Sequence, residues 1–222
     1  YRILAPFELC ASEAGAPTRR RRVFFVGFDP DRMSSLEMSC LRAALQKHGA
    51  TVRDALRGLP RVRAEWQSED ESWRQVERLP KGYFYDRVSG LVPQGVGDPM
   101  ALARYSEKRE ASGNLGTVHT AKTIERFQRL SIGQQDPISK ATRLRPSGLC
   151  PTLRAGTGPD RGSYQAVRPI HPTSPRVITP REAARLQGFP DWFLFHPTKW
   201  HAFRQIGNSV SPFVGETLLS WV

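Results

Sequence analysis

The 222-residue sequence lacks paired cysteines and long apolar segments, and it has fewer acidic than basic residues. Its three cysteines, Cys10, Cys40 and Cys150, form no Cys-x-x-Cys pair, and their odd number argues against a disulfide framework. No apolar run approaches the roughly 20 residues that a membrane-spanning helix needs, and the first residues lack the layout of a signal peptide. We therefore expect an intracellular protein without a membrane span or a bound metal.

Acidic residues are scarce relative to basic ones. Lysine and arginine total 33 against 21 acidic residues, which gives a net charge of +12, and arginine greatly outnumbers lysine. Positive charge concentrates polyanions, and the planar guanidinium binds phosphates and guanine edges through two hydrogen bonds. The charge favours a nucleic-acid-binding protein, although a basic protein from a GC-rich genome would show the same balance.

Hydrophobic periodicity and capping residues predict the main elements. Residues 1–10 are expected to form a strand leading into a turn, and residues 23–28 a central strand buried on both faces. From 61 to 116 we expect loops and short strands, some of them poorly ordered, and further short strands near Thr152 and Tyr164. Helices are expected over 36–45 behind a capping box that starts at Ser34, and over 52–56, 120–130, 179–187 and 212–221.

Several segments together resemble conserved blocks of DNA (cytosine-5) methyltransferases. Residues 177–191, VITPREAARLQGFPD, resemble the ninth block, and residues 205–212, QIGNSVSP, resemble the tenth. Residues 15–23 are similar to the eighth block, usually Gly-Val-Pro-Gln-x-Arg-x-Arg, with Thr18 where glutamine is usual. Pro151-Thr152-Leu153 resembles the short threonine-leucine element of the target-recognition region, which this family inserts between blocks eight and nine.

The resemblance implies an α/β fold in three parts. Residues 1–30 would supply a late strand of a Rossmann-like methyltransferase sheet, and residues 196–222 would return to that sheet through the terminal helix. Residues 31–195 would form an α+β target-recognition domain that includes the ninth block. The ninth-block helix organises the recognition region in this family, so we expect Arg181, Glu182 and Arg185 to be structural. Ser211 is expected to cap the terminal helix.

The resemblance also assigns site residues. Arg22 would donate to O2 of a cytosine rotated out of the duplex, because attack at C6 pushes negative charge onto that oxygen. Arg20 would fix the nucleophile loop or the phosphate backbone beside it. We predict both arginines to be catalytic, against the alternative of a solvated basic turn. Thr152 is predicted to bind a DNA phosphate, although an ordinary strand threonine fits equally well. The predicted wall of the S-adenosyl-L-methionine pocket is Asn208, Ser209 and Val210.

The sequence contains no recognisable nucleophile. The reaction needs a cysteine thiolate to add to cytosine C6, and in this family it stands in a Pro-Cys-Gln or similar loop. None of the three cysteines has that context, and the glycine-rich cofactor loop and the Glu-Asn-Val block are missing as well. All three normally precede the eighth block. We therefore expect the C-terminal part of a bacterial-type enzyme, inactive alone, cytoplasmic and associated with the nucleoid.

The expected partners are double-stranded DNA and the N-terminal catalytic part of the same enzyme. Two other interpretations stay open. The chain would be a subunit of a natural split enzyme if its reading frame began near Tyr1. It would be a stand-alone DNA-binding module if catalysis had been lost, but the tenth block argues against this, because a pure binding module needs no cofactor wall.

Overall fold

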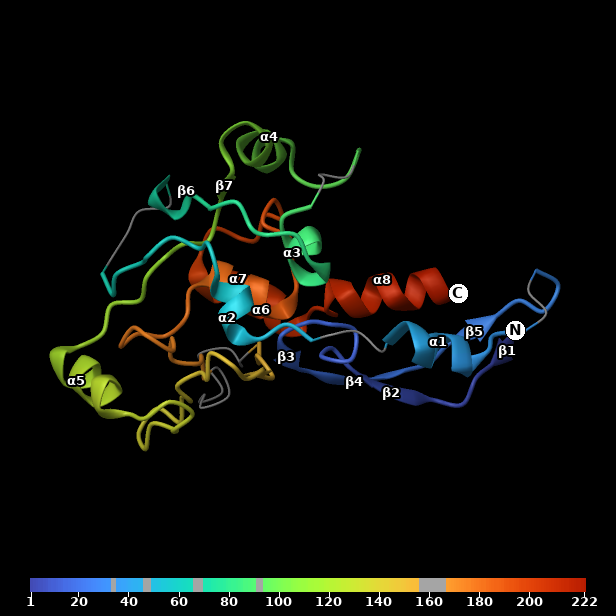
Figure 1. Ribbon diagram of the computed structural model, residues 1–222, viewed down its shortest axis with the longest axis horizontal. Coiled ribbons are helices and arrows are strands. Elements are labelled where there is room, and N and C mark those ends of the chain that lie inside the picture. The colour runs from blue at the N-terminus through green and yellow to red at the C-terminus, as the bar shows by residue number, and fades with distance from the viewer. Residues whose placement is uncertain (33–34, 46–48, 66–69, 91–93, 156–166) are drawn as a thin grey trace.

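The computed structural model describes residues 1–32, 35–45, 49–65, 70–90, 94–155 and 167–222. The molecule is elongated (Figure 1), with both termini at one end, near α1 (Met38–Leu45), α8 (Pro212–Trp221) and the first strands. The opposite end carries α5 (Ala121–Arg129). The segments that resemble the methyltransferase blocks lie between these two ends.

Short strands form four two-stranded sheets among the described residues. Two of these sheets continue one another as a single antiparallel arm, in which β2 (Phe7–Cys10) pairs with β4 (Arg21–Phe24) and β1 (Arg2–Ile3) with β5 (Gly27–Phe28). The other two sheets join distant segments: β3 (Thr18–Arg19) runs parallel to β8 (Cys150–Pro151), and β6 (Arg74–Gln75) runs antiparallel to β7 (Glu110–Ala111).

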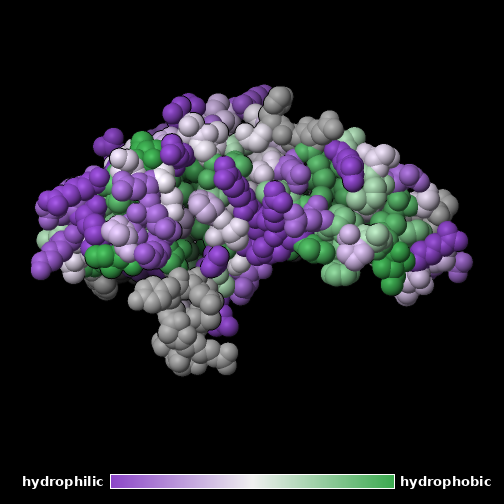
Figure 2. All heavy atoms as spheres, turned by 90° about the horizontal axis from the view of Figure 1, so that it is seen from below, coloured by the Kyte–Doolittle hydropathy of each residue, from purple (hydrophilic) through white to green (hydrophobic). Residues whose placement is uncertain are grey.

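The expectation of a central strand over 23–28, buried on both faces, was wrong. β4 ends at Phe24 and β5 begins at Gly27, while Val23 is 55% exposed and Phe25 is 75% exposed. β-Branched and aromatic residues do favour a strand here. Burial on both faces, however, requires a covering layer on each side, and the described residues leave these two side chains uncovered. Figure 2 shows hydrophobic residues on the surface at the end of the molecule that carries the two termini.

The helices predicted around 52–56, 120–130, 179–187 and 212–221 are confirmed. They are α2 (Val52–Leu56), α5, α6 (Pro180–Gln187) and α8. α1 begins at Met38, two residues later than predicted, and the expected capping box includes Ser34, which lies outside the described residues. Leu41 and Leu45 of its predicted apolar face are buried, but Cys40 is exposed.

Residues 61–116 contain more regular structure than the predicted loops and short strands. They include a single 3-10 turn at Asp70–Ser72, α3 (Tyr83–Val88) and α4 (Pro99–Lys108). The Asp98 side chain accepts the Ala101 amide in front of α4, and proline follows at the first helical position. This cap is readable in the sequence, but the density of glycine and proline around it conceals the signal.

Two further differences lie in the second half of the chain. α7 (Lys199–Asn208) is a helix without a sequence prediction, and it contains the first four residues of the segment that resembles the tenth block. The strand expected near Thr152 is β8, which ends one residue before it, and Tyr164 lies outside the described residues.

Helix α6 is at the centre of the core, and all eight of its residues are buried. Its apolar side chains pack in a cluster that also takes residues from β2, α2, α3, α7 and α8, among them Leu9, Val52, Phe84, Ile206 and Phe213. The core therefore draws on all three predicted parts of the chain, and the boundaries between those parts stay a prediction.

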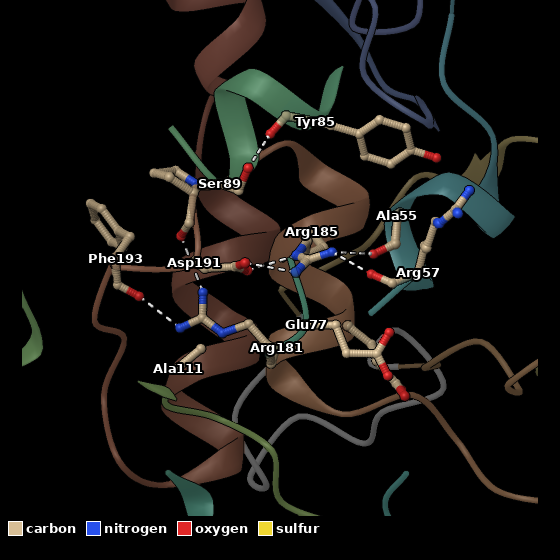
Figure 3. Close-up of polar contacts among 12 residues, drawn as sticks. Ala55, Arg57, Glu77, Tyr85, Ser89, Ala111, Arg181, Arg185, Asp191 and Phe193 are labelled. Carbon is tan, nitrogen blue, oxygen red and sulfur yellow. Dashed lines mark hydrogen bonds and ion pairs between the residues drawn. The ribbon is translucent and has the colours of Figure 1, made fainter. Parts of the chain in front are cut away.

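Two fully buried arginines of α6 tie this core together (Figure 3). Arg185 pairs with both carboxylate oxygens of Asp191 at 2.6 Å each and donates to the Arg57 carbonyl at 2.8 Å. Arg181 donates to the carbonyls of Ser112 at 2.7 Å and Phe193 at 2.8 Å. Burial lowers the pKa of Arg181 to about 10, so its guanidinium stays charged at neutral pH. A buried charge is tolerated when its donors are satisfied, and these bonds therefore fix three segments around α6.

The first turn of α6 is held by a second buried pair. Glu182 accepts from Arg176 through both carboxylate oxygens, at 2.7 and 2.9 Å, and from the Thr179 amide at 2.8 Å. Thr179 accepts from the Glu182 amide in return, which completes the predicted capping box. These contacts agree with the structural role expected of Arg181, Glu182 and Arg185. Ser211 is the N-cap residue of α8, as expected, but its side chain makes no capping bond to a described residue.

We predict that Arg185→Gln destabilises the protein by about 3–5 kcal/mol, because it leaves the Asp191 carboxylate buried without its partner. The midpoint of urea unfolding, followed by circular dichroism, measures the change. Arg129→Gln is the control, since Arg129 pairs with Glu125 on the exposed face of α5. That substitution should cost about 0.5 kcal/mol or less. Equal losses for the two variants would contradict the central role of Arg185.

Candidate functional site

Three segments that are far apart in the sequence meet beside β3. Thr18 lies opposite Cys150 and Arg19 opposite Pro151 in the parallel β3–β8 pair. The Cys150 amide donates to the Pro17 carbonyl at 2.9 Å, and the Thr18 hydroxyl donates to the Cys150 carbonyl at 3.3 Å. The segment that resembles the eighth block is thus joined directly to the threonine-leucine element.

Arg20 adds the third segment. Its side chain is almost completely buried and donates to the Leu153 carbonyl at 3.2 Å and to the Gly207 carbonyl at 2.7 Å. Burial, followed by the charge of Arg22, lowers the pKa of Arg20 to about 10, so the guanidinium is still protonated at neutral pH. One side chain therefore clamps the threonine-leucine element to helix α7.

The clamp depends on the absence of a side chain at Gly207. A Cβ atom there would lie 2.5 Å from the Ala155 nitrogen and 2.7 Å from the Ala155 Cα. Both are backbone atoms that cannot rotate away, so only glycine permits this contact between α7 and residues 154–155.

Arg22 and Thr152 lie on the exposed rim of this junction. Arg22 stands opposite Leu9 on β4, and its Nη1 donates to the neighbouring Arg21 carbonyl at 2.6 Å. The Thr152 hydroxyl donates to the Arg19 carbonyl at 2.5 Å. A hydroxyl has a single donor. Thr152 would therefore have to release Arg19 before it donated to a phosphate, and in the present geometry it reinforces the β3–β8 contact.

The predicted cofactor residues lie at and just beyond the end of α7. Asn208 is exposed and Val210 is 48% exposed, whereas the Ser209 hydroxyl donates to the Ile206 carbonyl at 2.8 Å. Gln187 of α6 donates to the Ser209 carbonyl at 3.4 Å. The Ser209 backbone is thus bonded to α6, while the Asn208 amide and the Val210 side chain stay exposed to solvent. This pairing fits one wall of a site for a nucleoside-type cofactor, which needs both polar and apolar contacts.

The three cysteine thiols lie in different surroundings. Cys150 is fully buried, and burial raises the pKa of its thiol far above the usual range. The Cys10 sulfur accepts from the Ser12 hydroxyl at 3.1 Å, and Cys40 is exposed on α1. The described residues contain no group of three histidine, cysteine, aspartate or glutamate side chains that could hold a metal ion. No described helix is long and apolar enough to cross a membrane.

Sequence reasoning brings these segments to one site but misses how they are joined. The acceptors of Arg20 are the backbone carbonyls of Leu153 and Gly207, which lie 133 and 187 residues away. Every residue carries a carbonyl, so no residue type identifies these partners in the sequence. Glycine at position 207 is the one detectable signal of the close approach.

Comparisons with known proteins agree with the motifs. The sequence pattern of the C-5 cytosine-specific DNA methylase family matches residues 8–221. The chain is 37% identical over 225 residues to the Type II methyltransferase M.XorII of Xanthomonas oryzae pv. oryzae, covering 98% of this chain and 48% of that protein. It is 26% identical to the Type II methyltransferase M.DdeI of Desulfomicrobium norvegicum, covering 96% of this chain and 53% of that protein.

A solved structure shows the same fold. It is described as a DNA modification methyltransferase encoded within a prophage of E. coli, and it matches with a TM-score of 0.87 and 48% sequence identity. The match covers 100% of this chain and 60% of that one. The chain thus spans about half the length of the two curated relatives named above.

We predict opposite effects for two glycine substitutions in helices. Gly207→Ala should destabilise the protein by about 1–3 kcal/mol, because the added methyl collides with the Ala155 backbone. Gly215→Ala on α8 meets nothing within 4 Å. It should stabilise by roughly 0.5–1 kcal/mol through helix propensity. Thermal unfolding of both variants measures the difference, and stabilisation by Gly207→Ala would refute the close contact.

Proposed function

Because this chain belongs to the C-5 cytosine-specific DNA methylase family, we propose that it provides DNA recognition and one wall of the cofactor site in such an enzyme. The reaction is transfer of a methyl group from S-adenosyl-L-methionine to C5 of a cytosine in duplex DNA, within a bacterial cytoplasm. The observation that carries the proposal is the junction at Arg20, where segments resembling block eight, the threonine-leucine element and block ten meet.

The nucleophile and the main catalytic sheet would come from residues outside this chain, as in a C-terminal part joined to an N-terminal catalytic part. Cys150 is buried in the core, and neither Cys10 nor Cys40 has the expected sequence context. The uncovered side chains of Val23 and Phe25 support this division, because the arm of β2 and β4 would gain its missing layers from that part. The arm would then contribute late strands of a Rossmann-like sheet.

Arg22 is the proposed catalytic residue. A cytosine within a duplex hides C5 and C6, so it must rotate out of the stack before a thiolate can add to C6. The addition places negative charge on O2, and a protonated guanidinium aimed at that oxygen stabilises the transition state. Arg22 is exposed on β4 beside the junction, and among the described residues its guanidinium has one acceptor, the adjacent Arg21 carbonyl. It can therefore turn to a bound base.

Arg20 has a different proposed role. Both of its terminal nitrogens are committed to backbone carbonyls in the buried junction, and it does not lie on the exposed rim. We therefore assign Arg20 a positioning role in place of direct contact with the nucleophile loop or with phosphate. It would hold Thr152, next to Leu153, and Asn208, next to Gly207, in fixed relation to each other.

The proposed cofactor wall is formed by Asn208, Ser209 and Val210. S-adenosyl-L-methionine supplies the methyl group when it is bound. The bonds of Arg20 to Gly207 and of Gln187 to Ser209 keep this wall in place without using its exposed side chains. The wall and the threonine-leucine element are thereby attached to the same rigid junction.

We expect Arg22→Ala to lower the methylation rate by on the order of a hundredfold or more in the enzyme that combines this chain with its nucleophile, by analogy with loss of an oxyanion donor. Single-turnover methyl transfer to duplex DNA measures the rate. Arg21→Ala is the matched control, because Arg21 is exposed on the same strand and pairs with Glu8. It should change the rate little. Similar rates for both variants would show that the roles of the two arginines are misassigned.

The chain itself should bind duplex DNA with an affinity that falls steeply as salt is added. Its net charge of +12 allows several lysine and arginine contacts to phosphate, each of which releases counterions. Fluorescence anisotropy with a labelled duplex, titrated between 50 and 200 mM salt (about the range over which such contacts are lost), gives the slope. An affinity that does not change with salt would contradict a phosphate interface.

A further inference from the structure

A hollow of about 1510 Å³ lies within residues 31–195, the part predicted to form the target-recognition domain. Its walls are α2 with the stretch that follows it to residue 65, and residues 171–176 ahead of α6. The stretch after α2 and residues 171–176 lie between α2 and α5 in Figure 1. None of the residues that form the Arg20 junction lines this hollow. It is therefore a separate feature of the surface.

The first wall carries two exposed arginines on either side of a buried residue. Val62 is buried, and its carbonyl accepts from Arg176 Nε at 2.8 Å. Arg61 precedes Val62 in the sequence and Arg63 follows it. Both are exposed, and both line the hollow. The buried Arg176 thus fixes the backbone that carries the two exposed arginines.

Two more arginines come from α2 and the residue that ends it. Arg53 lies in α2, and Arg57 is its C-terminal cap, with an extended backbone. Both are exposed and line the same hollow. Their backbone is also fixed, since the Arg53 amide donates to the Pro146 carbonyl at 2.8 Å and the Arg57 carbonyl accepts from Arg185. The backbone that carries these four exposed arginines is therefore fixed by hydrogen bonds to neighbouring segments.

Carboxylates balance little of this charge. Glu182 lines the hollow, but both of its oxygens are bonded to Arg176, and among the described lining residues Glu65 is the one other acidic side chain. None of the four exposed arginines forms an ion pair with a described residue. Clustered like charges destabilise the folded state unless an anion neutralises them. The arrangement is suited to a ligand that carries several negative charges in a row.

We propose that this hollow binds the phosphodiester backbone of duplex DNA, as a second anchor apart from the Arg20 junction. The inference rests on the proposed function for the nature of the ligand. Arg61 and Arg63 are separated by one residue, and their exposed side chains can reach neighbouring phosphates of one DNA strand. Such contacts position the protein on the duplex without reading its sequence.

The test uses the whole chain and a labelled duplex of about 30 base pairs, a length that exceeds a typical single-module site. The double variant Arg61→Gln/Arg63→Gln is compared with Arg42→Gln/Arg78→Gln, which removes the same charge from exposed positions outside the hollow. Each lost phosphate contact lowers the slope of log affinity against log salt by about 0.9, so the first variant should lose about 1.8. Its affinity should fall on the order of tenfold. The slope of the control variant should change by less than half of what one lost phosphate contact causes.

The outcomes separate the two proposals. If the unmodified chain binds duplex DNA and both double variants keep its slope, the second anchor is refuted and the proposed function stands. If the unmodified chain does not bind duplex DNA, both proposals fail. The same variants are also titrated with a labelled single-stranded RNA. If Arg61→Gln/Arg63→Gln weakens binding to that RNA but leaves the affinity for duplex DNA unchanged, the hollow binds another polyanion and the inference is overturned. Urea unfolding midpoints equal to that of the unmodified chain confirm that all variants are folded.

Discussion

Two guanidinium groups buried in α6 are the constraint on which the rest of this structure depends. Burying a charge is costly unless every donor finds an acceptor, and Arg181 and Arg185 find theirs on the segments around α2, β7 and the turn after α6. These segments cannot shift independently without leaving a charge unsatisfied. The core is therefore specified by directional bonds as well as by apolar packing (Figure 3).

The same constraint extends to both surfaces for which we propose a function. The Arg57 carbonyl accepts from Arg185, and the Val62 carbonyl accepts from Arg176, so the wall of the arginine-lined hollow is attached to the centre of the core. At the other surface, Gln187 of α6 reaches Ser209, and α6 packs on α7. Polar ligands bind with less loss of entropy when the groups that meet them are already fixed.

The arginines divide into two kinds by burial. Arg20, Arg176, Arg181 and Arg185 are buried and bond mainly to backbone carbonyls and to the carboxylates of Glu182 and Asp191, where they hold segments together. Exposed arginines, such as Arg22, Arg61 and Arg63, lie on backbone segments next to those that the buried arginines bond. The excess of arginine therefore serves folding and the proposed DNA contacts together, because its planar fork can satisfy several acceptors and stays charged when buried.

The sequence by itself determined the elements whose signals are local and the family to which the chain belongs. The capping box at Thr179 and Glu182, the proline that opens α8 and the glycine that ends α6 act within a few residues, so α6 and α8 were predictable. Tertiary structure alone decided what depends on distant partners. Exposure of Val23 and Phe25 depends on which layers cover β4, and Arg20 finds its acceptors on backbone carbonyls that every residue possesses. One wall of the arginine-lined hollow is held by the bond from buried Arg176 to the Val62 carbonyl, a long-range contact that no local pattern encodes.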